Sequence, residues 1–294
     1  MEANKIFEAH TNYVLGLQFS PDSRLLISSG MDKTIKLWSV PAWELLKTLE
    51  GHDNSVNGLA LSPDGSRLAS SSSDTTVKLW SFPHGELLHT LQDRKKVVSA
   101  VKFSPDGRWV AAGSYGGRVM IWDVNGVSLH GFQANGNRNL SSLAFSSAEN
   151  ILATSGLGDE ISLWKIPQGE LLHSLKGHKT AVGALKFIQS GSLLVSLGYE
   201  GKVIFWDTRT WQPLRTYQSR MAGLRGLAIS PDERVAALSM EGRVELHAVA
   251  DWSLLAELTL ETKAVNGMAF SPDGKYLAVG AADRKIRIWE LPLA

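Results

Sequence analysis

The sequence predicts an all-β protein built from seven similar units of four antiparallel strands. A short segment that ends in Trp recurs along the whole chain, each repeat holds several runs of strand-forming residues, and no convincing helical pattern separates them. The last residues of the recurring segment are Trp38, Trp80, Trp122, Trp164, Trp206, His247 and Trp289. They are 42 residues apart, except for 41 between Trp206 and His247, so seven repeats account for the 294 residues.

Each repeat provides four candidate strands. In the first repeat Ile35 and Leu37 alternate with Lys36 and Trp38, and this period of two is typical of a strand. The run VLGLQFS, the turn SPDS at residues 20–23 and the run RLLISS precede it, and ELLKTL follows it. Pro sets the backbone of the second turn position and Asp bonds back to the backbone, so SPD predicts a tight turn between two strands.

Seven such sheets bury their apolar faces best when they are arranged radially. A linear stack would expose two apolar ends, whereas radial closure exposes none. We therefore predict a single domain, residues 1–294, with the fold of a seven-bladed β-propeller. The last repeat has no fourth strand after LPLA, but Lys5–His10 aligns with Lys47–His52. We expect residues 3–8 to complete the blade formed by residues 264–291 and so to close the ring.

The motifs of the repeat resemble those of the tryptophan–aspartate (WD) repeat family. The second repeat contains Gly51–His52, Ser62–Gly65, Asp74 and Trp80 in the family's order, and the resemblance covers the whole chain. It implies a propeller that acts as a non-catalytic scaffold for proteins or peptides. It also implies that partners dock on the face formed by the loops entering the first strand and those before the third strand of each blade.

Three repeats contain His, Ser, an acidic residue and Trp at matched offsets. These residues are His10, Ser28, Asp32 and Trp38; His52, Ser70, Asp74 and Trp80; and His178, Ser196, Glu200 and Trp206. Such residue types could form the triad of a hydrolase. The resemblance instead implies a buried hydrogen-bonded chain that pins the loop entering a blade to its third strand.

The repeats themselves favour this structural interpretation. Where His is replaced by Arg94, Arg220 or Glu261, the hydroxyl position becomes Ala112, Ala237 or Val279, as loss of a mutual hydrogen bond requires. The fourth repeat is an exception, because it keeps Thr154 opposite Gly136. A catalytic triad would occur once and not in three copies, so we predict no catalytic residue and no enzyme.

Large side chains at the predicted loop face make it the candidate partner-binding surface. Tyr, Met and Leu precede the acidic turn position in five repeats, where polar residues would be ordinary, and such enrichment is typical of interfaces. Together with the start of the first strands, the candidates are Tyr13, Leu15, Met31, Asn57, Tyr115, Asn139, Leu157, Tyr199, Arg225, Met240 and Asn266. The alternative is that the apolar members pack on neighbouring blades.

Basic residues fall in the same loops and favour an acidic partner, although ordinary solvated loop charges would give the same pattern. They are Arg94, Lys95, Lys96, Arg138, Lys179, Arg220 and Lys263. A second candidate surface comprises Trp43, Trp211 and Trp252, each five residues after the end of the recurring segment. These three could equally cap the connection to the outer strand, or Trp211 and Trp252 could form an exposed pair.

Composition excludes several other classes of protein. The formal charge is +1, so no overall field favours nucleic acid or a membrane surface, and the absence of Cys excludes disulfides and thiolate metal sites. No spacing of His residues indicates a metal, and no signal peptide or membrane span is visible. We expect a cytoplasmic monomer without metal or cofactor. Two alternatives remain open: an enzyme or small-molecule binder using the mouth of the central channel, and one domain of a larger regulator.

Overall fold

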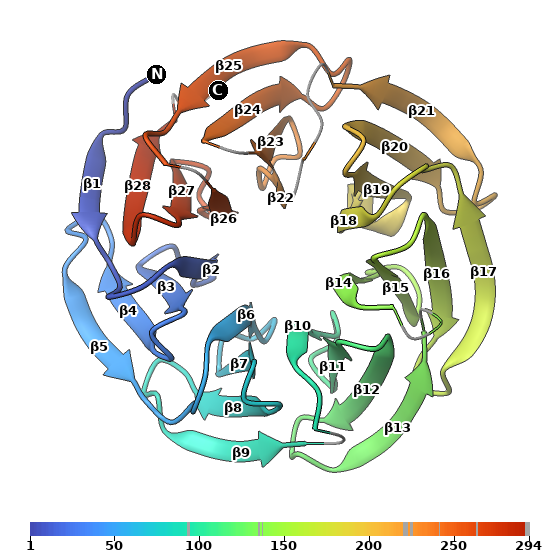
Figure 1. Cartoon of the computed structure of the whole chain (residues 1–294), viewed down its shortest axis with the longest axis horizontal. Helices are drawn as coiled ribbons and strands as arrows, with labels where there is room; N and C mark the ends of the chain where they lie inside the picture. Colours follow the sequence, from blue (N-terminus) through green and yellow to red (C-terminus); the bar gives the residue numbers. More distant parts are fainter. Residues whose placement is uncertain are drawn as a thin grey trace. The chain divides into compact units, whose positions relative to one another are not determined.

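Each repeat of the sequence forms one four-stranded antiparallel sheet. The computed structural model describes residues 1–92, 95–134, 136, 138–219, 223, 226–240, 242–262 and 264–291. These residues form seven sheets, which we call blades 1 to 7 in the order of the repeats, and Figure 1 shows their strands. The helical content of the described residues is one short turn, Gln189–Gly191. The predicted all-β fold with seven four-stranded antiparallel blades is confirmed.

The chain divides into two compact units. The first unit contains Met1–Leu59 and Gly226–Ala294, and the second contains Ala60–Arg225. In the first unit, blade 1 has strands β2 (Val14–Phe19), β3 (Leu25–Gly30), β4 (Ile35–Ser39) and β5 (Leu45–Leu49). Blade 6 has β22 (Gly226–Ile229), β23 (Val235–Met240), β24 (Arg243–Ala248) and β25 (Leu254–Thr259). Blade 7 has β26 (Val265–Phe270), β27 (Tyr276–Ala281), β28 (Lys285–Glu290) and β1 (Lys5–Glu8).

The second unit contains three complete blades. Blade 3 has β10 (Val98–Phe103), β11 (Trp109–Ser114), β12 (Arg118–Asp123) and β13 (Ser128–Gln133). Blade 4 has β14 (Leu140–Phe145), β15 (Ile151–Gly156), β16 (Glu160–Lys165) and β17 (Glu170–Lys176). Blade 5 has β18 (Val182–Ile188), β19 (Leu193–Gly198), β20 (Lys202–Asp207) and β21 (Pro213–Gln218). Blade 2 has β6 (Val56–Leu61), β7 (Arg67–Ser72), β8 (Val77–Ser81) and β9 (Leu87–Leu91), and the division between units falls within β6.

The N-terminal strand completes the last blade, as predicted. Strand β1 pairs antiparallel with β28, with Lys5 opposite Ile288 and Glu8 opposite Lys285. The backbone N–H of Asn4 extends this ladder by donating to the carbonyl of Ile288 at 2.8 Å. The outer edge of β28, which would otherwise present unpaired backbone groups, is therefore covered by a segment more than 270 residues away in the sequence.

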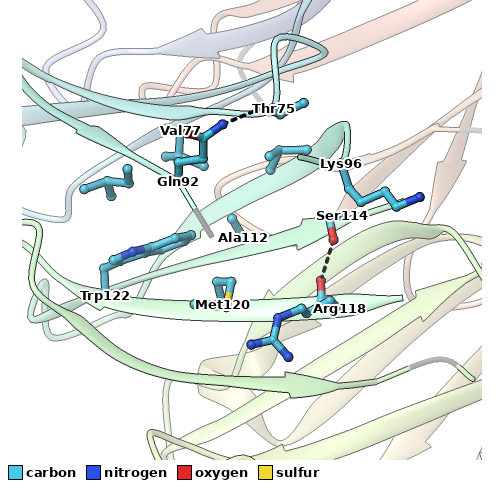
Figure 2. A pocket seen from close by; sticks show the side chains of 11 residues that line it. Thr75, Val77, Gln92, Lys96, Ala112, Ser114, Arg118, Met120 and Trp122 are labelled. Atoms are coloured by element: carbon cyan, nitrogen blue, oxygen red, sulfur yellow. Dashed lines mark hydrogen bonds between the residues drawn. The ribbon is translucent and has the colours of Figure 1, made fainter. Parts of the chain in front are cut away.

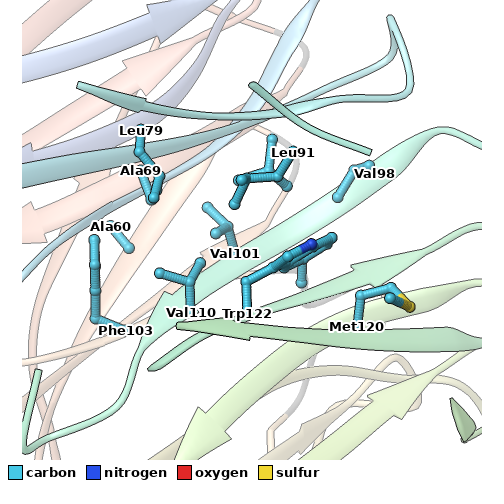
Figure 3. Packing of buried hydrophobic residues seen from close by; sticks show 12 residues of the cluster. Ala60, Ala69, Leu79, Leu91, Val98, Val101, Phe103, Val110, Met120 and Trp122 are labelled. Carbon is cyan, nitrogen blue, oxygen red and sulfur yellow. The ribbon is translucent and has the colours of Figure 1, made fainter. Parts of the chain in front are cut away.

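The core lies between the faces of successive sheets. In the second unit, Leu79 and Leu91 of blade 2 pack with Val101, Val110 and Trp122 of blade 3, all of them buried (Figure 3). Neighbouring first strands also contact one another, as β10 does β14 and β14 does β18. The period of two in the sequence thus places apolar side chains against the next sheet within each unit.

The first strands approach closely because their facing residues are small. A Cβ atom on Gly267 would lie 2.9 Å from the carbonyl oxygen of Leu15, so a larger residue there would displace the neighbouring backbone. In the second unit the corresponding Ser142 accepts a hydrogen bond from the backbone N–H of Leu185 in the next blade at 3.1 Å. Close packing of the blades is therefore built into single positions of the repeat.

The SPD turns join the first and second strands as predicted. In blade 1 the Ser20 hydroxyl donates to Asp22 at 2.6 Å, and Asp22 accepts from the backbone N–H of Arg24 at 3.1 Å. The hydrogen bond from Ser20 contributes most to holding the pKa of Asp22 below its usual range.

In the part of the chain that the structure describes, no helix is long and apolar enough to cross a membrane.

Candidate partner-binding surface and the networks beneath it

Blade 5 contains an unbroken chain of side-chain hydrogen bonds. The Trp206 indole N–H donates to Ser196 Oγ at 2.9 Å, and Ser196 Oγ lies 2.7 Å from His178 Nε2. On the other side of the imidazole, His178 Nδ1 lies 2.9 Å from Glu200 Oε1. Ser196 and His178 are buried, and Glu200 accepts a further bond from the backbone N–H of Lys179 at 3.2 Å. The chain therefore ties the entering loop to the second and third strands and to the turn between them.

A neutral imidazole satisfies every member of this chain. Burial lowers the pKa of His178 below its ordinary value, although the Glu200 carboxylate acts in the opposite direction. The Nδ1–H can then donate to Glu200, and Nε2 can accept the proton of the Ser196 hydroxyl. Burial alone would raise the pKa of Glu200, but hydrogen bonds, first that from Thr180, outweigh it and lower the pKa.

Blade 1 repeats the same geometry. Trp38 Nε1–H donates to Ser28 Oγ at 2.8 Å, His10 Nε2 lies 2.8 Å from Ser28 Oγ, and His10 Nδ1 lies 2.9 Å from Asp32 Oδ1. Burial would raise the pKa of Asp32, but hydrogen bonds from His10 and from the backbone of Thr11 hold it well below its usual range. In blade 2 the Trp80 indole donates to Ser70 Oγ at 2.9 Å.

The remaining residues of this set in blade 2 are divided between the two units. His52 belongs to the first unit and is buried, whereas Asp74 belongs to the second. Asp74 accepts hydrogen bonds from the backbone N–H and the hydroxyl of Thr76 at 2.9 and 2.7 Å. This acidic residue therefore orders its own turn, as Asp32 does by accepting from Thr34 at 2.8 Å.

Blades 3 and 4 have cavities where blades 1 and 5 have the network. In blade 3, Ala112 replaces the serine, and a cavity of about 20 Å³ opens beside Ala112 and Trp122 (Figure 2). In blade 4, Thr154 still accepts from the Trp164 indole at 2.9 Å, but Gly136 stands in the place of the histidine. A polar cavity of about 330 Å³ lies there, lined by Ala134, Gly136, Arg138, Gly158, Asp159, Glu160 and Ser162.

Blades 6 and 7 have other polar contacts on their third strands. In blade 6, His247 replaces the tryptophan, and its Nε2 lies 2.9 Å from Glu245 Oε2 in a buried pair. In blade 7, Arg287 pairs with Asp283 at 2.5 Å, and the Trp289 indole donates to the backbone carbonyl of Met1 at 3.3 Å. The sequence of blades 6 and 7 indicated only that the network is lost. In the structure, different polar contacts take its place.

The predicted partner residues of blades 3 and 4 form one exposed surface in the second unit. Tyr115 is 45% exposed and Leu157 is 52% exposed. Asn139 lies between them: its Oδ1 accepts from the backbone N–H of Gly116 at 3.1 Å, and its backbone carbonyl accepts from the N–H of Leu157 at 2.9 Å. One residue thus fixes both turns. We call Tyr115, Asn139 and Leu157 the Tyr115–Leu157 surface.

The other predicted partner residues are less uniform. In blade 1, Tyr13 and Met31 are exposed and joined by a backbone bond of 2.9 Å from the Met31 N–H to the Tyr13 carbonyl. Asn266 is exposed, and its amide donates to the carbonyl of Val14 at 3.0 Å. Leu15, Asn57 and Tyr199 are half-buried.

The prediction is wrong for Met240. This side chain is 3% exposed, because Met240 is the last residue of β23 and pairs with Arg243 instead of lying in the turn. The connection in blade 6 is one residue shorter than in the other blades, which accounts for the spacing of 41. Met240 therefore aligns with Gly30 of blade 1 and not with Met31, and by the same shift the counterpart of Ser28 is Leu238 and not Ala237.

Four of the predicted basic residues are exposed, namely Lys95, Lys96, Arg138 and Lys179. The predicted residues Arg94, Arg220, Arg225 and Lys263 lie outside the described residues. Within the described chain, no group of three His, Asp or Glu side chains is placed to hold a metal ion.

The three additional tryptophans act as caps between elements. Trp43 lies 6.5 Å from Phe19 and 5.2 Å from Tyr276 between ring centroids, with edge-to-face geometry. Trp211 packs 6.0 Å from His173 of the preceding blade. Trp252 is buried and stacks on His247 at 5.2 Å, so an exposed pair of Trp211 and Trp252 is excluded.

The family comparison agrees with the repeats. The family model described as "WD domain, G-beta repeat" matches residues 1–39, 43–81, 85–123, 169–207 and 252–290. The matched stretches cover more than half of the chain and leave out residues 124–168 and 208–251. The first stretch contains Gly136 in the loop before the first strand of blade 4, and the second contains His247 in the third strand of blade 6; both residues depart from the pattern.

Proposed function

The chain belongs to the WD-repeat family, with the fold class of a seven-bladed β-propeller, and from that premise we propose that it is a non-catalytic scaffold that binds a partner protein. Propellers of this family commonly serve protein interactions. The Tyr115–Leu157 surface is the part of the chain that best supports the proposal. Two large apolar side chains stand exposed there on turns where polar residues would be ordinary.

Fixed geometry supports this choice of surface. The Asn139 bonds to Gly116 and Leu157 connect the turns of two different blades. Beneath them, the Ser99 hydroxyl of blade 3 lies 2.7 Å from the carbonyl oxygen of Leu140 in blade 4. The scaffold therefore loses little conformational freedom when a partner covers Tyr115 and Leu157, and this favours affinity.

The surroundings of this surface favour an acidic partner segment. Arg138 lines the polar cavity of blade 4 and is exposed, and the exposed Lys95 and Lys96 lie between the outer strand of blade 2 and the first strand of blade 3. Two acidic residues also line this cavity: Glu160 is paired with Lys176 at 2.9 Å, and Asp159 lies near the same lysine. We infer that Tyr115 and Leu157 supply the apolar contacts and that the nearby cations add charge attraction that salt should weaken.

The His–Ser–acid sets support a structural role and not catalysis. Ser28 and Ser196 are fully buried, and each hydroxyl oxygen already accepts an indole N–H. A nucleophile must reach its substrate, whereas these hydroxyls lie inside their blades. The same arrangement occurs in blades 1 and 5, which is expected of a repeated structural device.

A variant carrying Tyr115→Ser and Leu157→Ser tests the proposal. Partners captured from the native source by the wild-type chain should be lost by the double variant. They should be kept by the control Leu214→Ser, which changes an equally exposed leucine on the outer strand of blade 5. All three proteins should melt within a few degrees of one another. Retention of every partner by the folded double variant would contradict the proposal.

A further inference from the structure

The residue five positions after the recurring Trp packs against the preceding blade in blades 1, 4 and 5, and in blade 3 the residue four positions after it does so. In blade 1 this residue is Trp43, which has a φ of 60°. That conformation is uncommon for a bulky side chain, so packing must offset its cost. The offset comes from edge-to-face contacts with Phe19 of the same blade and Tyr276 of blade 7.

Three junctions of the second unit also bring this turn against the preceding blade, in these cases against its outer strand. Trp211 of blade 5 packs on His173 of blade 4. Blades 3 and 4 have glycines with positive φ in this turn: a Cβ on Gly126 would lie 3.1 Å from His89, and one on Gly169 would lie 2.8 Å from His130. These three histidines occupy the same place on the outer strand of the preceding blade, opposite Leu79, Ile121 and Leu163.

At the junction between blades 6 and 7, no aromatic side chain of the described residues lines this place. The register puts Ala256 opposite Leu246, so Ala256 is the counterpart of His173. The repeat likewise makes Val235 the counterpart of Tyr276. Both residues line a cavity of about 720 Å³, together with Leu246, Leu255 and Leu291. We call these five residues the blade 6–7 groove.

The sequence provides no large side chain for this groove at the usual position. Five residues after Trp289 stands Ala294, whose methyl group is much smaller than the indoles of Trp43 and Trp211. Ala294 itself lies outside the described residues. The lining is mainly apolar, and its volume falls within the range of ligand sites, large enough for an aromatic ring together with flanking backbone.

We propose that the blade 6–7 groove binds an extended segment of a partner protein through one large aromatic side chain, which takes the place that Trp43 and Trp211 fill elsewhere. Trp is the best match, because one indole, Trp43, packs on the counterpart of Val235 and the other, Trp211, packs on the counterpart of Ala256. This groove involves the SPD turns of blades 6 and 7, at the ends of the first strands opposite to Tyr13 and Asn266. The groove is therefore a different site from the Tyr115–Leu157 surface and shares no residue with it.

The rim of the groove predicts weak dependence on salt. Asp232 and Asp273 border it, but Arg234 lies 3.9 Å from the first carboxylate and Lys275 lies 3.7 Å from the second. Each of these two carboxylates therefore has a cation close by. Binding here should depend on apolar contact, in contrast to the salt-sensitive binding expected for the Tyr115–Leu157 surface.

Fluorine NMR of a labelled peptide tests the proposal. The probe is an acetylated and amidated Gly-Gly-Trp-Gly-Gly peptide with 5-fluorotryptophan, and the same peptide with Ala competes as a negative control. Ala256→Trp should fill the groove and weaken binding of the probe by about tenfold or more, as should Leu255→Asp at an exposed lining position. Leu254→Trp, on the same strand but outside the lining, should change binding less than about twofold.

Several results would overturn the proposal. They are no binding of the probe to the wild type, unchanged binding to both Leu255→Asp and Ala256→Trp, or equal affinity for free 5-fluoroindole, which would indicate a small-molecule site. Two further results would assign the groove to a different occupant: tighter binding after deletion of residues 292–294, or dimerisation of the chain that Leu255→Asp abolishes. The double variant Tyr115→Ser, Leu157→Ser should bind the probe normally, so failure of the two proposals can be distinguished.

Discussion

Blades 5 and 3 of the second unit build the same four strands with different interiors. In blade 5 the third strand is tied to the entering loop by Trp206, Ser196, His178 and Glu200. In blade 3 the corresponding interior has Ala112 and a cavity of about 20 Å³ beside Trp122. The strands form in both cases, so apolar packing between sheets suffices for the blade, and the polar chain is an additional fastening.

The difference extends to the loops above the two interiors. Tyr199, on the turn of blade 5, is half-buried, and the neighbouring Glu200 is held by His178. Tyr115 and Leu157, on the turns of blades 3 and 4, are exposed above interiors without a histidine. Within the second unit, the exposed turn residues thus lie above interiors without the full network, whereas blade 1 has both the network and the exposed Tyr13 and Met31, so the network does not by itself decide the exposure of a turn.

The largest effect is expected for a blade that lacks the network and depends on a distant strand. Deletion of residues 1–9 removes the β1–β28 ladder and the Met1 carbonyl that accepts from Trp289. We expect the free energy of unfolding to fall by about 4 kcal/mol or more, since several backbone bonds at about 1 kcal/mol each are lost. An unchanged unfolding midpoint in urea would contradict the role of β1.

Ser196→Ala should come next. It leaves the Trp206 indole N–H and His178 Nε2 without their shared partner inside the blade. We expect a loss of about 2–3 kcal/mol, because buried polar groups without a partner keep their full desolvation cost. Urea unfolding measures this change. A loss below about 0.5 kcal/mol would mean that the chain of hydrogen bonds in blade 5 is not a fastening.

Acid should weaken blade 5 through the same histidine. Burial lowers the pKa of His178, so the unfolded chain binds a proton there at higher pH than the folded chain does. Stability is then lost as the pH falls below about 6.5, by no more than about 1.4 kcal/mol per pH unit for this group. The lowered pKa of Glu200 adds a further loss at lower pH. Unfolding curves at pH 7.5 and 5.5 should show a smaller pH effect in His178→Gln than in the wild type; an equal effect would contradict this assignment.

The smallest effect is expected for Ala112→Ser in blade 3. The hydroxyl could accept from the Trp122 indole beside the existing cavity, which has room for about one water-sized group. Without the rest of the chain it should change stability by less than about 1 kcal/mol in either direction. A gain as large as the loss in Ser196→Ala would show that the Trp–Ser bond alone carries the fastening.

The sequence predicted the strands and networks because both repeat. Trp38, Ser28 and His10 recur at constant offsets, so a hydrogen-bonded set could be identified before any geometry was known. Met240 was misplaced because a one-residue deletion shifts a turn, although the spacing of 41 carried that signal. Motif matching also gave no sign of the Arg287–Asp283 pair, because it replaces the network by a contact that occurs once.

Other features depend on contacts between blades, which a single sequence does not show. Asn139 bridges two turns through one side chain and one carbonyl, and nothing in its own repeat indicates this. The blade 6–7 groove follows from the small residues Ala256 and Val235 at the places of His173 and Tyr276, and identifying Ala256 required the register of the strands. Exposure separated Tyr115 and Leu157 from Met240, which the pattern had treated alike.

Site-specific photocrosslinking tests the central claim most directly. A photoreactive phenylalanine analogue at position 157 or 115 should capture a partner protein in the native source, and added salt should reduce the yield. The same analogue at position 214, on the outer strand of blade 5, should capture none of that partner. Equal capture from position 214, or no capture from positions 115 and 157 in a correctly folded protein, would contradict the claim that the Tyr115–Leu157 surface binds the partner.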